Sequence, residues 1–129
     1  MRPNTASFSR DVVAEFSSKM EAAGLGHGFY YSTGNNFYLN RINFQPAGKL
    51  LPGQANVTDS VYNALVLAHV TELWSQFGNL TEIWFDHGYG GALKQQLQQL
   101  LRRYQPDAAG FGGYVSENER GENRGENEI

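Results

Sequence analysis

The residues with the clearest chemical potential gather around Asp86. Segment 81–88 reads Thr-Glu-Ile-Trp-Phe-Asp-His-Gly, an apolar run with β propensity that ends in a carboxylate and a glycine turn. Because side chains alternate between the two faces of a strand, Trp84 and Asp86 are expected to share one face. A carboxylate beside an aromatic ring at the carboxyl end of a strand suits nucleophilic attack on a sugar. In the structural alternative, Asp86 caps the helix predicted to open near Gly90.

Metal chemistry is not expected, and neither is a cofactor. The three histidines, His27, His69 and His87, are far apart and share no ligand spacing with one another or with carboxylates. His69 falls on the apolar stripe of a predicted helix, which favours a core or interface role. His87 directly follows Asp86, so it is either a neighbour of the reacting group or an ordinary turn residue.

Other reaction classes find less support. The run Gly88-Tyr89-Gly90-Gly91 follows a strand and opens a helix, but the third glycine of the dinucleotide fingerprint is missing. No Lys-Ser/Thr pair marks a phosphate loop, and an acid at the strand end would repel phosphate. The chain has no cysteine and no Gly-x-Ser-x-Gly elbow, so thiol and serine hydrolase chemistry is not expected.

Composition narrows the partners. The 129 residues are 40% hydrophobic and 13% aromatic, values typical of a globular domain. A net charge of −3 with scattered basic residues argues against a nucleic-acid partner or an anionic membrane surface. No apolar run is long enough to cross a membrane, and no signal peptide is visible at the amino terminus. The sequence does not indicate a compartment.

Apolar periodicity alternates between helical and extended segments along most of the chain. Helices are predicted over 11–23, 59–76 and 93–104, and strands over 28–32, 81–85 and 108–112. The connection from Ser32 to Gln54 is long, polar and contains glycines, as functional loops often do. The alternation predicts an α/β fold with parallel strands and right-handed crossovers. Three strands cannot close a barrel, so we favour a slice of a larger fold over the alternative of a small open α/β domain.

The chain changes character after Gly113. Residues 115–129 are almost wholly polar, repeat Gly-Glu-Asn at 121–123 and 125–127, and show no apolar periodicity. Such a composition predicts disorder. We therefore expect an organised unit over residues 1–114 and a polar, disordered tail over residues 115–129.

Four segments carry a resemblance to a known family. They are Gly-Phe-Tyr-Tyr-Ser at 28–32, Thr-Glu-Leu-Trp at 71–74, Phe-Gly-Asn-Leu-Thr-Glu-Ile-Trp-Phe-Asp at 77–86 and Tyr-Gln-Pro-Asp-Ala at 104–108. In one continuous order, from about Ser9 to Gly113, the chain resembles the α-L-fucosidases of glycoside hydrolase family twenty-nine, and the plant and fungal branch most of all. The segment Trp-Phe-Asp, preceded directly by Asn-Leu-Thr-Glu-Ile, is the most specific part of this resemblance.

The resemblance implies a (β/α)8 barrel that hydrolyses terminal α-L-fucose with retention of configuration. Asp86 aligns with the nucleophile of the family, and Trp84 matches the aromatic residue beside it. Tyr31 lies in the strand whose tyrosine faces the sugar, with Tyr30 as the alternative. His87 stands where the family usually has glycine, so it would narrow the mouth of the site and lie near the substrate.

Other parts of the family pattern have no counterpart in this sequence. The amino-terminal strands that carry the fucose-gripping histidine and tryptophan residues are missing, and no apolar anchor surrounds Glu122 or Glu126, so neither is assigned as the acid/base. We therefore expect a fragment of a retaining α-L-fucosidase that acts on fucosylated glycans, in a family whose members are often secreted, lysosomal or vacuolar. The alternative is a non-catalytic sugar-binding or non-functional truncated chain. Uncovered parallel strands also predict marginal stability and association through strand edges.

Overall fold

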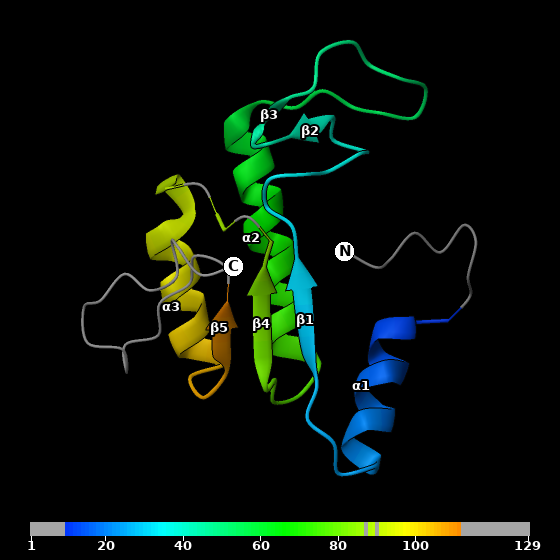
Figure 1. Cartoon of the computed structure of the whole chain (residues 1–129), viewed down its shortest axis with the longest axis vertical. Helices are drawn as coiled ribbons and strands as arrows, with labels where there is room; N and C mark the ends of the chain where they lie inside the picture. The colour runs from blue at the N-terminus through cyan, green and yellow to red at the C-terminus, as the bar shows by residue number, and fades with distance from the viewer. Residues whose placement is uncertain (1–9, 87, 90, 112–129) are drawn as a thin grey trace.

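The computed structural model describes residues 10–86, 88–89 and 91–111, which form an α/β unit with a parallel sheet (Figure 1). In chain order the elements are α1 (Val12–Ala22), β1 (Gly28–Tyr31), β2 (Arg41–Ile42), β3 (Gln45–Pro46), α2 (Asp59–Gln76), β4 (Glu82–Phe85), the short 3-10 helix η1 (Gly91–Leu93), α3 (Lys94–Tyr104) and β5 (Ala109–Phe111). Each predicted helix and strand is present. The α/β class with parallel strands is confirmed.

The main sheet has the strand order β1-β4-β5, and both pairs of neighbours run parallel. In this register Tyr30 of β1 lies opposite Trp84 of β4. A glycine is required at the start of β1, because a Cβ on Gly28 would stand 2.2 Å from the Glu82 carbonyl oxygen. The close approach of the two backbones at Gly28 supports the register of β1 against β4.

Helices cover one face of this sheet. In Figure 1, α2 lies behind β1 and β4, and α3 lies beside β5. Ile83 and Phe85 point from β4 into this layer and are fully buried, and the Phe85 ring meets Trp74 of α2 edge to face at 6.0 Å. The buried apolar core comprises Tyr62, Val66, Val70, Trp74, Leu80, Ile83, Phe85, Leu93, Leu97, Leu101 and Ala108. The opposite face presents the exposed Tyr30 and Trp84, and no helix of the described part covers it.

Helix α2 follows from local signals at both of its ends. The Thr58 hydroxyl accepts a hydrogen bond from the Val61 amide at the N-terminus, and Gly78 follows the C-terminus with φ +77°. Between these ends, apolar residues recur every four positions and are buried against the sheet. The span predicted for this helix is confirmed.

A buried glutamine joins the ends of three elements. The Gln105 side chain accepts a hydrogen bond from the Leu80 amide at 2.8 Å, and it donates to the carbonyl oxygens of Trp74 at 2.7 Å and Gly78 at 2.9 Å. It therefore connects the end of α3 with the end of α2 and with the lead into β4. Gln105 thus supports the strand that leads to Asp86, because buried backbone groups need a partner.

Two segments differ from the sequence expectations. The apolar residues of α1 are poorly buried for a helix predicted from apolar periodicity, since Val12 and Phe16 are exposed and Ser17 is the buried residue of that helix. The physical reason is that α1 lies at the β1 edge of the sheet, where Phe16 contacts the rings of His27 and Phe29 (Figure 1). The connection predicted as one long loop contains the antiparallel β2–β3 hairpin.

Two further expectations concern membrane-spanning helices and the carboxyl-terminal tail. None of the helices within the described ranges combines the length and apolar character that a bilayer span requires. The disordered tail predicted for residues 115–129 lies outside the described residues.

Candidate active site

Asp86 stands directly after the carboxyl end of β4. Its Oδ2 accepts a hydrogen bond from the Tyr30 hydroxyl at 3.1 Å. Tyr30 lies on β1 opposite Trp84, so the parallel pairing of the two strands brings the phenol to the carboxylate. The carboxylate is half-buried and is oriented from the neighbouring strand.

Two aromatic rings flank the carboxylate on the open face of the sheet. Tyr30 is 51% and Trp84 is 41% exposed, and their rings meet edge to face with centroids 5.3 Å apart. Aromatic side chains offer a large apolar surface, and tyrosine adds a polar hydroxyl. Asp86, Tyr30 and Trp84 therefore combine a nucleophilic oxygen, a hydroxyl donor and an apolar platform in one place.

Tyr31 lies on the other face of β1. Its hydroxyl forms a hydrogen bond with His69 Nδ1 of α2 at 2.9 Å, and burial raises the pKa of the phenol. Burial also lowers the pKa of His69, which favours the neutral imidazole. The structure therefore places Tyr31, which the sequence predicts to bind substrate, in the helix-facing layer, and it is Tyr30 that reaches Asp86. His69 has the interface role expected of it.

The remaining acidic and basic candidates do not complete the site. His87, predicted to bind substrate, lies outside the described residues. Glu82 shares a strand face with Trp84 and Asp86 but lies four positions before Asp86. At about 3.3 Å per residue the Cα atoms of Glu82 and Asp86 are about 13 Å apart along the chain, whereas a retaining pair needs carboxyl groups about 5.5 Å apart. Among the described residues there is also no group of three or more histidines and acids that could hold a metal ion.

In α3, the α-helix that follows Asp86, the first turn is not capped by a side chain. The N-cap residue of α3 is Leu93, and no side chain makes a capping hydrogen bond there. The turn after Asp86 is held from the β1 side instead, since Thr33 Oγ1 donates to the Gly88 carbonyl at 2.6 Å. The Tyr62 hydroxyl of α2 donates in turn to the Thr33 carbonyl at 2.9 Å. These bonds join β1, α2 and the turn after β4 at one edge of the sheet.

The sequence pattern alone does not reveal the Thr33 contact or the choice of Tyr30. Both depend on how β1 pairs with β4, and no local motif encodes that pairing. The sequence signal that could have identified Tyr30 is the alternation of side chains in β1. Tyr30 and Gly28 share one face of the strand, and Tyr31 and Phe29 share the other. A register fixed at Gly28 then selects Tyr30.

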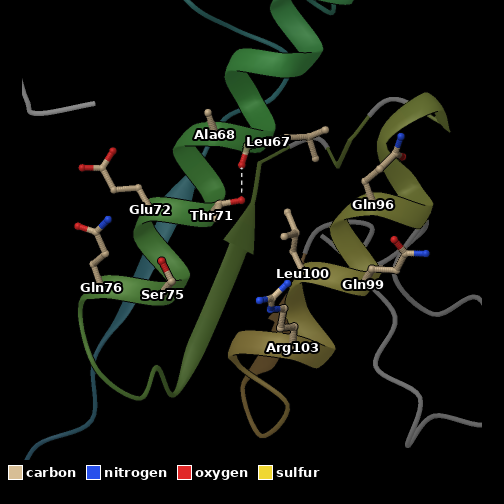
Figure 2. A pocket seen from close by; sticks show the side chains of 10 residues that line it. All are labelled: Leu67, Ala68, Thr71, Glu72, Ser75, Gln76, Gln96, Gln99, Leu100 and Arg103. Carbon is tan, nitrogen blue, oxygen red and sulfur yellow. Dashed lines mark hydrogen bonds between the residues drawn. The ribbon is translucent and has the colours of Figure 1, made fainter.

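A cavity on the helical side of the sheet is separate from this site. Figure 2 shows the side chains that line it between α2 and α3. The cavity has a volume of about 680 Å³. It is lined by Leu67, Ala68, Thr71, Glu72, Ser75, Gln76, Gln96, Gln99, Leu100 and Arg103. Neither Asp86 nor its aromatic neighbours line it, so it offers no access to the carboxylate.

The arrangement of strands and helices matches part of solved α-L-fucosidase structures. An unliganded α-L-fucosidase from Lactobacillus casei matches with a TM-score of 0.64 and 22% identity, over 81% of this chain and 37% of that chain. A structure assigned as an α-L-fucosidase from Bacteroides thetaiotaomicron matches with a TM-score of 0.64 and 26% identity, over 81% of this chain and 26% of that chain. The chain therefore has the fold of part of an α-L-fucosidase.

The amino-acid sequence leads to the same class. Over 107 residues the chain is 31% identical to α-L-fucosidase 1 from Arabidopsis thaliana. This match covers 78% of this chain and 18% of the relative. No protein-family model matches the chain. The chain is homologous to part of the α-L-fucosidases, and it spans about a fifth of the length of this curated relative. The resemblance inferred from the sequence is confirmed.

Proposed function

We propose that this chain carries the nucleophile of a retaining α-L-fucosidase, an enzyme that releases terminal α-L-fucose from fucosylated glycans. One observation carries the proposal: the Asp86 carboxylate follows a parallel strand and is hydrogen-bonded by Tyr30 beside the exposed Trp84 ring. Homology to part of the α-L-fucosidases supports it. The Lactobacillus casei enzyme has been solved with Fuca(1,6)GlcNAc, which supports a fucosylated sugar as the substrate class.

The parent architecture that we propose is a (β/α)8 barrel, with residues 1–114 as a portion of its wall. Strands that follow one another in the chain are neighbours in the sheet, and helices lie on one face, which is the pattern that repeats around such a barrel. The open face of the sheet would line the barrel interior. Asp86 would then stand at the carboxyl-end rim, where barrel enzymes place their catalytic groups.

In the first chemical step, an Asp86 oxygen attacks the anomeric carbon while the glycosidic C–O bond breaks, and a second carboxyl group gives its proton to the leaving oxygen. The Tyr30 hydroxyl holds Oδ2 and so orients the carboxylate for attack. Water then attacks the fucosyl–Asp86 ester with the second group as base, which restores the carboxylate and retains the configuration. The second carboxyl group would come from outside the described residues, and the Trp84 ring would pack against the C–H face of fucose.

Release of phenolate from an activated aryl α-L-fucoside tests this proposal. Such a leaving group needs little help from an acid, so nucleophilic attack is detectable without the second carboxyl group. We expect the full chain to release phenolate and Asp86→Asn to lose the release. The matched variant Glu82→Gln, on the same strand face, is expected to retain it. Equal rates for the unmodified chain and Asp86→Asn would contradict the proposal.

A second candidate is a non-catalytic sugar-binding chain. It is favoured by one observation, that the described site holds a single carboxylate at the strand ends while Glu82 is too distant to be its partner. This candidate predicts that fucose binds beside Trp84 and that phenolate is released neither by the unmodified chain nor by Asp86→Asn. Binding without turnover therefore separates it from the enzyme.

A further inference from the structure

The connection between β1 and α2 lies at the same edge of the sheet as Asp86. It leaves the carboxyl end of β1, forms the β2–β3 hairpin and extends beyond the strand ends at the top of Figure 1. Thr33 at its base donates to the Gly88 carbonyl, two positions after Asp86. In barrels of parallel strands, connections at this edge carry the groups that select the ligand.

Two adjacent aromatic side chains of this connection face solvent. Phe37 is 59% and Tyr38 is 69% exposed, and their rings meet edge to face with centroids 5.5 Å apart. Keeping two large rings in water forgoes the free energy that their burial would contribute. A ligand that covers the Phe37–Tyr38 pair would recover part of that free energy.

The backbone beneath these rings is held by several hydrogen bonds. The Phe37 carbonyl accepts from Gln54 Nε2 at 2.7 Å and from the Asn40 amide at 3.1 Å. The Tyr38 carbonyl accepts from the Ala55 amide at 2.8 Å. Because the turn is already ordered, a ligand that covers the rings loses little affinity to the ordering of the loop.

The hairpin that follows is anchored to the start of α2. The buried Arg41 guanidinium donates to Asp59 Oδ1 at 2.6 Å and to the Val57 carbonyl at 2.7 Å. It also lies over the Tyr62 ring, 4.8 Å from the centroid. Tyr62 donates to the Thr33 carbonyl, and Thr33 holds the turn after the candidate nucleophile. The ring pair and the nucleophile are therefore parts of one connected framework.

The composition of the connection favours an uncharged ligand. Among residues 32–57 the charged residues are Arg41, which is buried and paired with Asp59, and Lys49. The same stretch contains five asparagines and two glutamines, and Asn43 and Gln45 are exposed. Amides donate and accept hydrogen bonds with hydroxyl groups, and aromatic rings pack against apolar C–H faces. A pyranose ring has both kinds of surface, whereas a charged peptide or nucleic acid would find few opposite charges here.

We propose that Phe37 and Tyr38 form a platform for the saccharide to which the fucose is attached. The inference rests on the proposed function and deepens it, because it assigns recognition of the carrier sugar to this connection. The fucose ring would lie against Trp84 beside Asp86, and the next pyranose ring would pack on the Phe37–Tyr38 platform.

NMR titration of the isotope-labelled full chain tests the inference. The Trp84 indole reports on the inner site, and the Phe37 and Tyr38 amides report on the platform. The probes are free L-fucose, fucose-free lactose and a fucosylated lactose, with sorbitol as a polyol that lacks a ring face. The test variant is Phe37→Ala/Tyr38→Ala. Its matched control, Leu50→Ala/Leu51→Ala, removes two exposed aliphatic side chains from the same connection.

We expect fucose to shift the Trp84 indole signal and lactose to shift the amides of Phe37 and Tyr38. The fucosylated lactose should bind about tenfold more tightly than fucose, and the test variant should lose that gain while its affinity for fucose is unchanged. The control variant should keep the gain, and sorbitol should shift neither set of signals.

Three outcomes would point elsewhere. Fucose-induced shifts at Trp84 without lactose-induced shifts at Phe37 and Tyr38 would overturn this inference and leave the proposed function standing. Lactose-induced shifts at the platform without fucose-induced shifts at Trp84 would support the platform and overturn the proposed function. Signals of Phe37 and Tyr38 could also shift with the protein concentration and not with the sugar concentration. That result would overturn the inference and would indicate that the two rings contact another copy of the chain.

Discussion

Among single residues, Tyr30 and Tyr31 differ in the face of β1 that they occupy. Tyr30 donates to Asp86 on the open face, whereas Tyr31 forms a hydrogen bond with His69 beneath α2. The two side chains are chemically the same, so their different environments come from the alternation of the strand. Removing one hydroxyl at a time should therefore separate an effect on reactivity from an effect on stability.

Tyr30→Phe removes the hydroxyl that orients Asp86, and a hydrogen bond to a charged group contributes about 1.5–3 kcal/mol. Phenolate release should fall about tenfold or more, while the free energy of unfolding stays within about 0.5 kcal/mol of the unmodified value. Tyr31→Phe should leave the rate unchanged and lower the free energy of unfolding by about 0.5–1.5 kcal/mol. Aryl fucoside assays and urea unfolding measure the two effects. An unchanged rate in Tyr30→Phe would contradict the role of that hydroxyl.

The Tyr31–His69 pair also implies a pH dependence of stability. Burial lowers the pKa of His69 in the folded chain below its ordinary value of 6.5. The unfolded chain therefore binds the proton first as the pH falls, so stability is fully present above about pH 6.5 and decreases below it. Among the described residues, Asp11 of the α1 N-cap and Glu72 of α2 line the same cavity as His69, and the negative charge of Glu72 raises the pKa of His69 against the larger effect of burial.

His69→Gln removes the titrating group and serves as the comparison. Urea unfolding at about pH 7.5 and about pH 5.5 should show a larger loss of stability for the unmodified chain than for His69→Gln. Equal losses in the two proteins would mean that other groups cause the pH dependence.

At the scale of elements, helices and strands are predicted well where residues that favour a cap or a turn stand at their ends. Helix α2 has its predicted span because Thr58 and Gly78 mark its ends. The β2–β3 hairpin is missed because its turn uses Asn43 and Phe44, with φ values of 49° and 67°, and has no turn glycine. This strained turn is supported by a hydrogen bond from the Phe44 amide to the Gly34 carbonyl, and a Cβ on Gly34 would come 3.2 Å from the Phe44 ring.

Only those residues of the candidate site that lie on one strand can be predicted from the sequence, because the alternation of side chains applies within a single strand. Trp84 and Asp86 come from a single segment, so their shared face follows from parity. Tyr30 comes from another strand, and the choice between it and Tyr31 requires the register of β1 against β4. That register rests on a backbone approach at Gly28, which no side-chain pattern encodes.

The Gln105 contacts give a prediction for the elements around the site. Gln105→Ala leaves the Leu80 amide and the carbonyls of Trp74 and Gly78 without this partner. A buried polar group without a partner costs about 1–3 kcal/mol, so the free energy of unfolding should fall by about 3 kcal/mol or more. Gln99→Ala, on the exposed side of α3, should change it by less than about 0.5 kcal/mol. Urea unfolding compares the two, and similar effects would contradict the role assigned to Gln105.

At the scale of the whole molecule, the described unit is covered on one side only. Parallel sheets are normally buried on both faces, yet Tyr30 and Trp84 are exposed on the side opposite the helices. β1 and β5 are the outer strands of the sheet. Marginal stability and self-association therefore remain predictions, and the open face with Tyr30 and Trp84 is the surface expected to cause both.

Trp84→Lys places a charge on this open face and should raise the monomer fraction, because charged residues disfavour association of exposed sheet surfaces. Leu25→Lys is the control, since Leu25 is also exposed to solvent but lies in the turn between α1 and β1. Sedimentation velocity over a range of protein concentrations measures the difference. A monomeric unmodified chain with a cooperative thermal transition would contradict the prediction.

The strand order also has a consequence for the order of folding. Gly28 and Glu82 are twice as far apart along the chain as Glu82 and Ala109, which form the other strand pair. Closing a longer loop costs more entropy and is slower, so β4 and β5 should associate before β1 joins them. The contact between Tyr30 and Asp86 is then among the last to form. A chain caught before that step holds the carboxylate without the phenol that orients it, so reactivity toward a fucoside would report that folding is complete.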